Sequence, residues 1–234
     1  MYKIMLGLVA AGILAWSASA GAADTPYRAT ATCPVDDRPF TWTATASYST
    51  WGLELDAKPI GSTIFPRTIP QCPDSLFPVF KDEFTPVEKA TLRALVATPE
   101  YVAVQNESSY YLLHFVFEKM GEGDPMGLAW LLMQSTWQVR ETDPVRYIRY
   151  AAETIEAMDA ALPDIRESQP DDWWYLQVAT ANVQRQAGEF EGATRRLDAL
   201  TGEPPVGDLP ARIALTRQMI AAQDRSPGIM PDAR

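Results

Sequence analysis

Histidine and cysteine are nearly missing from this sequence of 234 residues. It contains one histidine, His114, and two cysteines, Cys33 and Cys72. A structural zinc site needs four Cys or His donors. Two thiolates with Asp36 would supply three ligands, and Ser75 is a poor fourth. A two-histidine metal motif is also excluded, so we expect neither a metal centre nor a cofactor.

The sequence also lacks the motifs of common catalytic sites. It has no Gly-x-Ser-x-Gly turn and no glycine-rich phosphate loop. A Ser-His-Asp triad would have to recruit His114, which lies in an apolar run and is more typical of a core or groove residue than of a general base. We therefore predict that the chain is not an enzyme and has no catalytic residues.

One carboxylate pair keeps a glycan alternative open. Asp171 and Asp172 precede Trp173 and Trp174, and glycan-cleaving enzymes place two carboxyl groups across a bond. Adjacent residues at a helix start, however, point in different directions and complement the positive helix end. We favour this structural interpretation, and cell-wall glycan binding or hydrolysis based on Asp172 stays an alternative.

Positive charge is scarce. The sequence has 30 Asp and Glu against 20 Lys and Arg, a formal net charge of −10. An acidic surface repels phosphate backbones, and no basic run overrides this repulsion. We therefore expect no nucleic-acid partner and no anionic-lipid partner.

Long apolar runs are also missing. Lys3 is followed by an apolar run over 4–16 and by small residues through Ala23, an order typical of a secretory signal peptide at 1–23, with cleavage after Ala20 or Ala23. The run is shorter than the roughly 20 residues of a membrane-spanning helix. We expect an exported protein without a stable membrane anchor, periplasmic in a Gram-negative cell and secreted otherwise.

The two cysteines have a simple explanation in an exported chain. Two cysteines outside the cytosol most often form one disulfide. The loop that a Cys33–Cys72 bridge closes corresponds to on the order of 4 kcal/mol in the chain-entropy model. We predict this disulfide, and a thiol-redox or metal-binding role of the same cysteines is kept as an alternative.

The first part of the chain after residue 23 has the pattern of a small β-rich module, 24–84. Apolar side chains alternate with hydroxyl-bearing ones from Phe40 to Tyr48, which predicts a half-buried strand. Prolines and glycines then recur up to Cys72 and beyond, so we expect no long helix there.

The pattern changes to helical at Thr85. Thr85-Pro86-Val87-Glu88 is a capping box that opens a helix through about Ala97, which Pro99 ends. Residues typical of helix starts and helix ends, with the spacing of apolar residues between them, predict further helices over 110–120, 126–140, 144–162, 171–187, 190–200 and 209–222. The helical domain is thus 85–224, and the proline-containing tail 225–234 is predicted to be disordered.

Two of these helices have informative faces. The helix over 126–140 is apolar nearly all round, which is typical of an element in the middle of a bundle or array. In the helix over 144–162 we expect one inward stripe, with a connector framed by Pro163 and Pro170 after it. The stripe consists of Val145, Ile148, Ala152, Ile155, Met158 and Leu162.

The order of these segments resembles the bacterial family known as domain of unknown function 2225. In that family a cysteine-rich, zinc-ribbon-like segment precedes tetratricopeptide-like helices. The resemblance rests on Cys-Pro at 33–34 and 72–73, the strand between them, the aromatic-rich stretch 76–80, the capping-box helix, Ala129-Trp130-Leu131, the stretch 138–141 and a Gly-Glu-Phe-Glu-x-Ala turn at 188–193. It covers most of the chain after residue 23.

The resemblance implies a mainly α fold of tetratricopeptide-like helical hairpins with a small disulfide-linked β-rich N-terminal module. Several positions match the pattern of a tetratricopeptide unit. The small residues are Ala181 and Ala193, the turn residue is Gly188, the aromatic residue is Phe190 and the large residue is Leu197. Gln177 and Thr180 stand where Trp and Leu are typical. Asp36 and Ser75 stand where family members that look metal-binding carry a second cysteine.

Stacked helix pairs leave a concave face on which a protein segment can place apolar anchors. We therefore predict a non-enzymatic adaptor or scaffold that binds a protein or peptide in a groove between helices. Trp173, Trp174 and Tyr175 are consecutive, so they cannot all face one side of a helix, and one of them is a candidate anchor. The predicted contact residues are Tyr111, His114, Trp173, Trp174 and Gln177.

Overall fold

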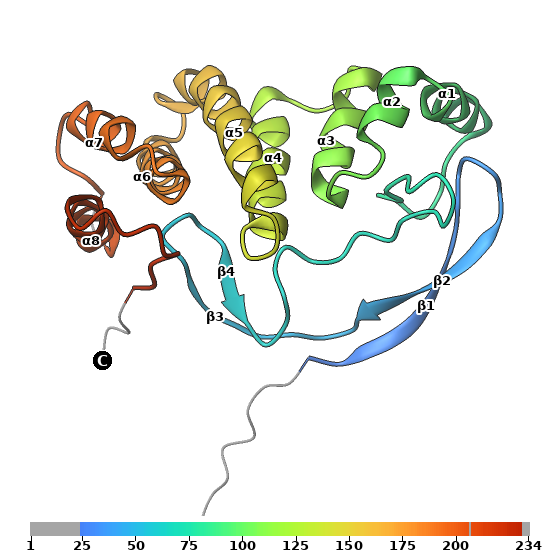
Figure 1. The fold of residues 1–234 in the computed structure, drawn as a ribbon, viewed down its shortest axis with the longest axis horizontal. Helices are drawn as coiled ribbons and strands as arrows, with labels where there is room; N and C mark the ends of the chain where they lie inside the picture. Colours follow the sequence, from blue (N-terminus) through green and yellow to red (C-terminus); the bar gives the residue numbers. More distant parts are fainter. Residues whose placement is uncertain (1–23, 206, 231–234) are drawn as a thin grey trace, which may run out of the picture.

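The computed structural model describes residues 24–205 and 207–230. The predicted signal peptide, 1–23, lies outside these residues. The described chain is mainly helical, with two small antiparallel sheets ahead of the helices (Figure 1). The predicted fold class, mainly α with a small disulfide-linked β module, is thus confirmed. Within the described ranges, no helix combines the length and the apolar character that crossing a membrane requires.

The helices follow the expected order closely. Gly121 and Gly188 each follow the last residue of a helix and adopt left-handed backbone conformations, with φ of 66° and 92°, as expected of helix ends. The helices are α1 (Pro86–Val96), α2 (Pro99–Val104), α3 (Ser109–Met120), α4 (Pro125–Val139), α5 (Pro144–Ile165), α6 (Pro170–Ala187), α7 (Phe190–Asp198) and α8 (Leu209–Ala221).

Prolines mark helix boundaries less simply than the sequence suggested. Pro99 does end α1, but it is also the first residue of the short helix α2, where Thr98 accepts a hydrogen bond from the amide of Tyr101. Pro163 was expected to end the preceding helix, yet α5 continues through it to Ile165. A proline so near a helix C-terminus disturbs only the last turns, so it does not end the helix outright.

The β module consists of two separate two-stranded sheets. In the first, β1 (Pro26–Thr32) pairs with β2 (Pro39–Thr45), with Ala29 opposite Trp42. In the second, β3 (Thr50–Leu53) pairs with β4 (Pro59–Gly61). The strand predicted from Phe40 to Tyr48 is therefore present but ends at Thr45. Phe40, Trp42 and Ala44 are the more buried positions, as expected, whereas Ala46 and Tyr48 lie beyond the strand and are exposed.

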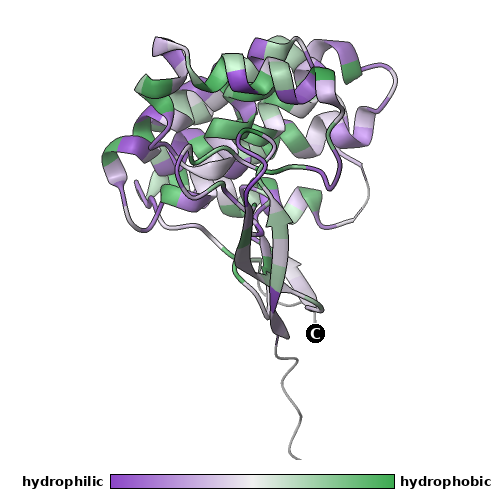
Figure 2. Ribbon diagram, turned by 90° about the vertical axis from the view of Figure 1, so that its right-hand side faces the viewer, coloured by the Kyte–Doolittle hydropathy of each residue, from purple (hydrophilic) through white to green (hydrophobic). Residues whose placement is uncertain are grey.

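The β segment follows the row of helices along one side. In Figure 1, β1 and β2 lie toward the α1 end of the row, and β3 and β4 lie below α5 and α6. The view in Figure 2 shows the helices grouped together and the strands projecting from them. The β module therefore contacts the helical part at two places rather than at one end.

Two hydrophobic cores correspond to these two places. The disulfide core joins the first sheet region to α1, α2 and α3 and contains Cys33, Cys72, Phe77, Val79, Leu92, Tyr101, Leu112 and Val116. The helical core lies among α4, α5, α6, α7 and α8, and its largest buried side chains include Met133, Trp137, Tyr147, Tyr150, Met158, Leu162, Trp173 and Trp174. As expected from its apolar surface, α4 lies between two neighbours, α3 and α5.

The inward face of α5 differs from the predicted stripe. Val145 and Ile148 were expected inside but are 80% and 50% exposed, whereas Tyr147 and Tyr150 are buried. Tyrosine buries more apolar surface than valine when its hydroxyl finds a partner. Here the Tyr147 hydroxyl donates to Gln186 over 3.2 Å, so the tyrosines determine which face is buried.

The C-terminal tail also differs from its prediction. We expected 225–234 to be disordered, but the part up to residue 230 lies against α6 and the β3–β4 hairpin. The buried Arg185 guanidinium donates to the carbonyls of Ser226 and Pro227 over 2.8 and 3.3 Å. The Gly228 carbonyl accepts from the amide of Leu55 over 3.0 Å. Composition did not reveal this order, because backbone carbonyls, which every residue has, make most of the contacts.

Candidate functional site

Both cysteines begin the same kind of turn. The amide of Cys33 donates to the carbonyl of residue 38, and its carbonyl accepts from the amide of residue 37; Cys72 makes the same pair with residues 77 and 76. Asp37 and Leu76, at equivalent positions, have φ of 59° and 56°. This conformation is uncommon for residues other than glycine. The two Cys-Pro segments, 33–38 and 72–77, thus fold into two equivalent turns, which we call the knuckles.

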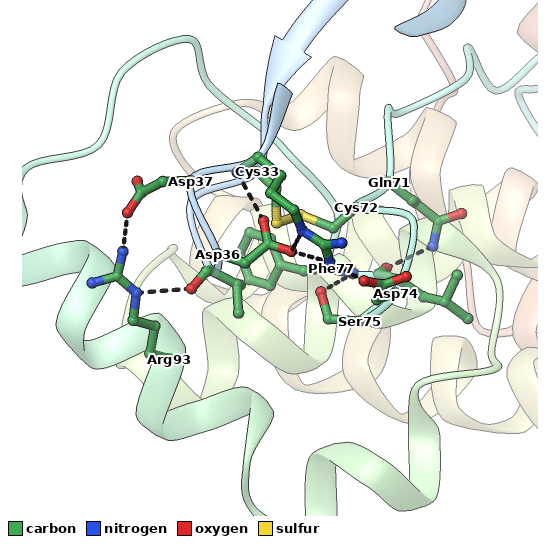
Figure 3. Close-up of a disulfide and its surroundings, with 12 residues drawn as sticks. Cys33, Asp36, Asp37, Gln71, Cys72, Asp74, Ser75, Phe77 and Arg93 are labelled. Atoms are coloured by element: carbon green, nitrogen blue, oxygen red, sulfur yellow. Dashed lines mark hydrogen bonds and ion pairs between the residues drawn. A yellow bond between two sulfur atoms is a disulfide. The ribbon is translucent and has the colours of Figure 1, made fainter. Parts of the chain in front are cut away.

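The predicted Cys33–Cys72 disulfide is confirmed and joins the two knuckles. Both cysteines are 0% exposed and lie in the disulfide core (Figure 3). Thiol–disulfide exchange requires a thiolate to reach a sulfur atom, and burial prevents this approach in the folded chain. The geometry therefore supports a structural role for this bond.

The residues at the positions of the missing cysteines have other partners. Asp36 accepts from the amide and Nε of Arg38 over 3.0 and 2.8 Å, and the hydrogen bond from that amide lowers the pKa of the Asp36 carboxyl. The Ser75 hydroxyl accepts from the amide of Phe77 over 3.4 Å. No group of three or more His, Cys, Asp or Glu that could hold a metal ion occurs among the residues described.

Ion pairs reinforce the knuckles from outside. Arg38 bridges Asp36 of the first knuckle and Asp74 of the second. Asp37 pairs with Arg93 on α1 (Figure 3) and with Lys89 on the same helix. These side chains are 29–67% exposed, so water screens the pairs and each adds little stability. The disulfide and the apolar core beneath it carry most of the stability here.

Tyr111 and His114, two of the predicted contact residues, lie on α3 and are partly buried. The Tyr111 ring stacks on the Tyr150 ring with 4.4 Å between centroids. The Arg149 guanidinium carbon lies 5.0 Å from the centroid of Tyr111 and 4.9 Å from that of Tyr150. His114 Nδ1 lies 3.2 Å from the carbonyl oxygen of Leu128. Burial lowers the pKa of His114, so the neutral imidazole donates to this carbonyl at neutral pH.

An ionic cluster keeps the Tyr111 region in place. Glu107 accepts from the hydroxyl of Tyr150 over 2.5 Å and pairs with Arg149 at 2.7 Å and Arg146 at 3.3 Å. The cluster connects the α2–α3 turn to α5. Tyr111 and His114 therefore act mainly as packing residues between α3, α4 and α5.

The prediction that Trp173 and Trp174 lie on an open contact surface is wrong. They are 7% and 8% exposed, and their rings meet edge to face with 5.7 Å between centroids. The sequence argument assumed that α6 has one buried face. Because α6 packs against α5, α7 and α8, neighbouring positions on it are buried against different helices.

Gln177 is half-buried, and its Oε1 accepts from Arg196 Nη1 over 2.8 Å. With Trp173 it lines a pocket between α6 and α7. Tyr111 and His114, by contrast, pack toward α4 and α5. The predicted contact residues therefore do not form one surface.

A groove that the sequence analysis did not identify opens between α4, α5 and α6. We call it the α4–α6 groove; its volume is about 390 Å³. Its residues are Asp124, Met126, Trp130, Ile165, Gln169, Asp172, Tyr175 and Leu176. Apolar side chains form its walls, and the carboxylates of Asp124 and Asp172 lie at helix starts beside it. The signal in the sequence was the surplus of apolar residues on α4, which exceeds what one buried face needs.

The opposite ends of α4 and α6 hold the β3–β4 hairpin. Asp56, in the hairpin turn, is 0% exposed and accepts from Arg140 on α4 over 3.0 Å and from Gln186 on α6 over 3.2 Å. Arg140 also pairs with Glu54 at 2.7 Å. Buried charges are tolerated when they are paired and hydrogen-bonded, and this cluster fixes the hairpin on the helices.

We compared the chain with protein-family models, with curated proteins and with solved structures, and none of the three comparisons found a match. The resemblance to the domain of unknown function 2225 family therefore stays a prediction.

Proposed function

We propose that this chain is a non-enzymatic, exported interaction protein that docks a peptide segment of its partner in the α4–α6 groove. The observation that carries the proposal is the groove itself. Side chains such as Trp130 and Leu176 form its wall and are half-buried in the free chain, so a partner side chain can cover the rest of their apolar surface. Burying apolar area contributes about 25 cal/mol per Å².

The charges beside the groove favour one kind of partner. Asp124 and Asp172 flank the apolar wall, and the whole chain has a formal net charge of −10. Complementary charge speeds encounter and excludes wrong partners. The proposed occupant is therefore a peptide segment that presents an apolar side chain next to Lys or Arg.

The groove is built on fixed elements. Asp124 accepts from the amide of Gly127 over 2.9 Å and thereby caps α4. At the far ends of α4 and α6, the Asp56 cluster joins Arg140 to Gln186. A site on elements that are already ordered loses little conformational entropy when it binds. This supports docking without a large rearrangement.

Glycan binding or hydrolysis is the second candidate, and one observation favours it. Asp172 lies in the same groove as the aromatic side chains of Trp130 and Tyr175, and Asp124 adds a second carboxylate. Sugar rings stack on aromatic faces, and two carboxyl groups are what glycoside hydrolysis requires. The thiol-redox alternative has less support, because Cys33 and Cys72 are buried.

The test is a binding assay with labelled peptides that share an apolar centre and differ in their flanks: basic, neutral or acidic. We expect the basic-flanked peptides to bind best. Leu176→Lys, which puts a cation in the groove, should abolish binding. The matched control is Val145→Lys at an exposed apolar position of α5, which should bind like the parent chain. Circular dichroism confirms that both variants are folded.

Two results would contradict the proposal. One is the absence of binding by every peptide class; the other is equal binding by the Leu176→Lys variant. Binding or cleavage of peptidoglycan fragments that is lost in Asp172→Asn, without peptide binding, would establish the glycan candidate instead.

A further inference from the structure

A second pocket, on the side of α6 that faces α7, is lined by arginines. Its volume is about 430 Å³ and its residues include Arg166, Arg195 and Arg196 with the amides of Gln177 and Gln184. We call it the arginine pocket. Like charges repel, and the chain as a whole is acidic, with a formal net charge of −10. Three cations around one small space therefore point to a ligand of opposite charge.

The arginine pocket is held in place by its own hydrogen bonds. Arg196 donates from Nε to Gln184 and from Nη1 to Gln177, each over 2.8 Å, and pairs with Asp159 at 2.7 Å. The amide oxygens of both glutamines are thus used by Arg196. Among the described residues, neither amide NH2 group donates a hydrogen bond to the protein, so both are available as donors to a ligand.

The other two arginines keep their charge available. The Arg166 guanidinium lies 4.8 Å from the ring centroid of Trp173, a cation–π contact that orients it without neutralising it. No carboxylate of the described residues pairs with Arg166. Arg195 pairs with Glu191 at 3.7 Å, and both side chains are mostly exposed, 74% and 95%. An exposed pair of this kind is weak.

Gly192 makes room for one of the donors. A Cβ atom at this position would lie 2.8 Å from Nε2 of Gln184, closer than a van der Waals contact allows. The glycine therefore lets the Gln184 amide lie against α7 at the pocket. A larger residue there would move the donor while the arginines stay in place.

We propose that the arginine pocket binds a carboxylate-bearing ligand of about the size of an acidic amino acid. Guanidinium groups bind carboxylates through parallel hydrogen bonds, and the glutamine NH2 groups add neutral donors. Ala199 and Leu200 line the same pocket and suit a short aliphatic body. This inference does not depend on the α4–α6 groove, because the two sites share no lining residue.

The experiment is calorimetric titration of the chain with three probes of one carbon skeleton: glutarate, glutaramate and glutaramide, which carry two, one and no carboxylates. We expect affinity to fall in that order and to fall further with added salt. Arg166→Gln and Arg195→Gln should each weaken glutarate binding about ten-fold, because each loses a hydrogen bond between charged groups. Arg217→Gln, an exposed arginine on α8 paired with Asp198, is the matched control and should bind like the parent.

Gly192→Ala gives a second, independent test that leaves every charge in place. It should weaken glutarate binding while Arg217→Gln does not. Inorganic phosphate is the competing probe. Tighter binding of phosphate than of glutarate, equal binding of glutaramide, or unchanged affinity in both Arg166→Gln and Arg195→Gln would overturn the proposal.

Discussion

The disulfide core and the hairpin contact attach the same β segment to the helices by different chemistry. At the α1 end the attachment is covalent, between Cys33 and Cys72 in an apolar core. At the α4–α6 end it is ionic, with Asp56 buried between Arg140 and Gln186. The comparison teaches that one β segment can be fixed on a row of helices by a covalent bond at one end and by a buried ion pair at the other.

The two attachments also differ in how they respond to solvent conditions. A buried disulfide is indifferent to salt and to moderate pH, whereas a buried ion pair depends on both partners being charged and hydrogen-bonded. The hairpin attachment lies at the ends of α4 and α6 opposite to the groove. The ionic attachment therefore joins the far ends of two of the helices that form the groove.

Removing the disulfide is the largest expected perturbation. The Cys33→Ser and Cys72→Ser double variant should lose about 4 kcal/mol of unfolding free energy, because the unfolded chain is no longer constrained. Urea denaturation of the oxidised parent and of the variant measures this loss. A difference below about 1 kcal/mol would show that the apolar core alone holds the knuckles.

Removing one charge from the hairpin contact comes next. Asp56→Asn keeps the shape of the side chain but removes the fully buried carboxylate and leaves Arg140 with Glu54 and the exposed Glu141 as partners, so we expect a loss of about 3 kcal/mol. The matched control is Asp198→Asn, which removes the exposed pair with Arg217 and should cost less than about 1 kcal/mol. Equal losses in the two variants would contradict a special role for the buried pair.

Acid should weaken the α1 end of the molecule through one partly exposed residue, Glu88. The Lys81 side chain, followed by the Thr85 amide, lowers the pKa of Glu88 from 4.5 to about 2. A lowered pKa means that the folded state favours the carboxylate, so this contribution is complete above pH 4.5 and is lost as the pH falls toward 2. Melting temperatures of the parent and of Glu88→Gln measured across this range should therefore converge at low pH.

The control for this titration is Glu122→Gln, at an exposed position between α3 and α4. Its melting curve should follow that of the parent at every pH. A gap between parent and Glu88→Gln that stays constant from pH 5 to about pH 2 would contradict the capping contribution.

The smallest expected effect concerns the helical core. The Tyr175 hydroxyl is buried without a hydrogen-bond partner among the described residues, and an unsatisfied buried hydroxyl costs free energy. Tyr175→Phe should therefore be as stable as the parent, or more stable by up to about 1 kcal/mol. Peptide binding in the groove should persist because the ring stays. Destabilisation by more than about 1 kcal/mol would reveal a hydrogen bond at this hydroxyl.

The sequence was sufficient where a signal is local. Alternation from Phe40 onward predicted β2, the capping box at Thr85 predicted α1, and the two cysteines predicted the disulfide. Each of these features depends on residues close in the chain or on a pair with no competing partner.

The sequence was insufficient where the burial or the partner of a residue depends on elements that are distant in the chain. Trp173 and Trp174 are both buried because α6 has several neighbours. Asp56 and Arg140 are 84 residues apart, and no local pattern connects them. The α4–α6 groove arises from three helix ends that meet in space, so its residues could not be recognised one helix at a time.

The central claim is that the two attachments are separate, so that the hairpin contact and the α4–α6 groove persist without the disulfide. Hydrogen–deuterium exchange of the Cys33→Ser and Cys72→Ser variant tests it directly. We predict faster exchange in residues 26–45 and 70–120, with residues 50–61 and the α4–α6 region as protected as in the parent. Exchange that rises equally throughout the described chain, the β3–β4 hairpin included, would contradict the claim.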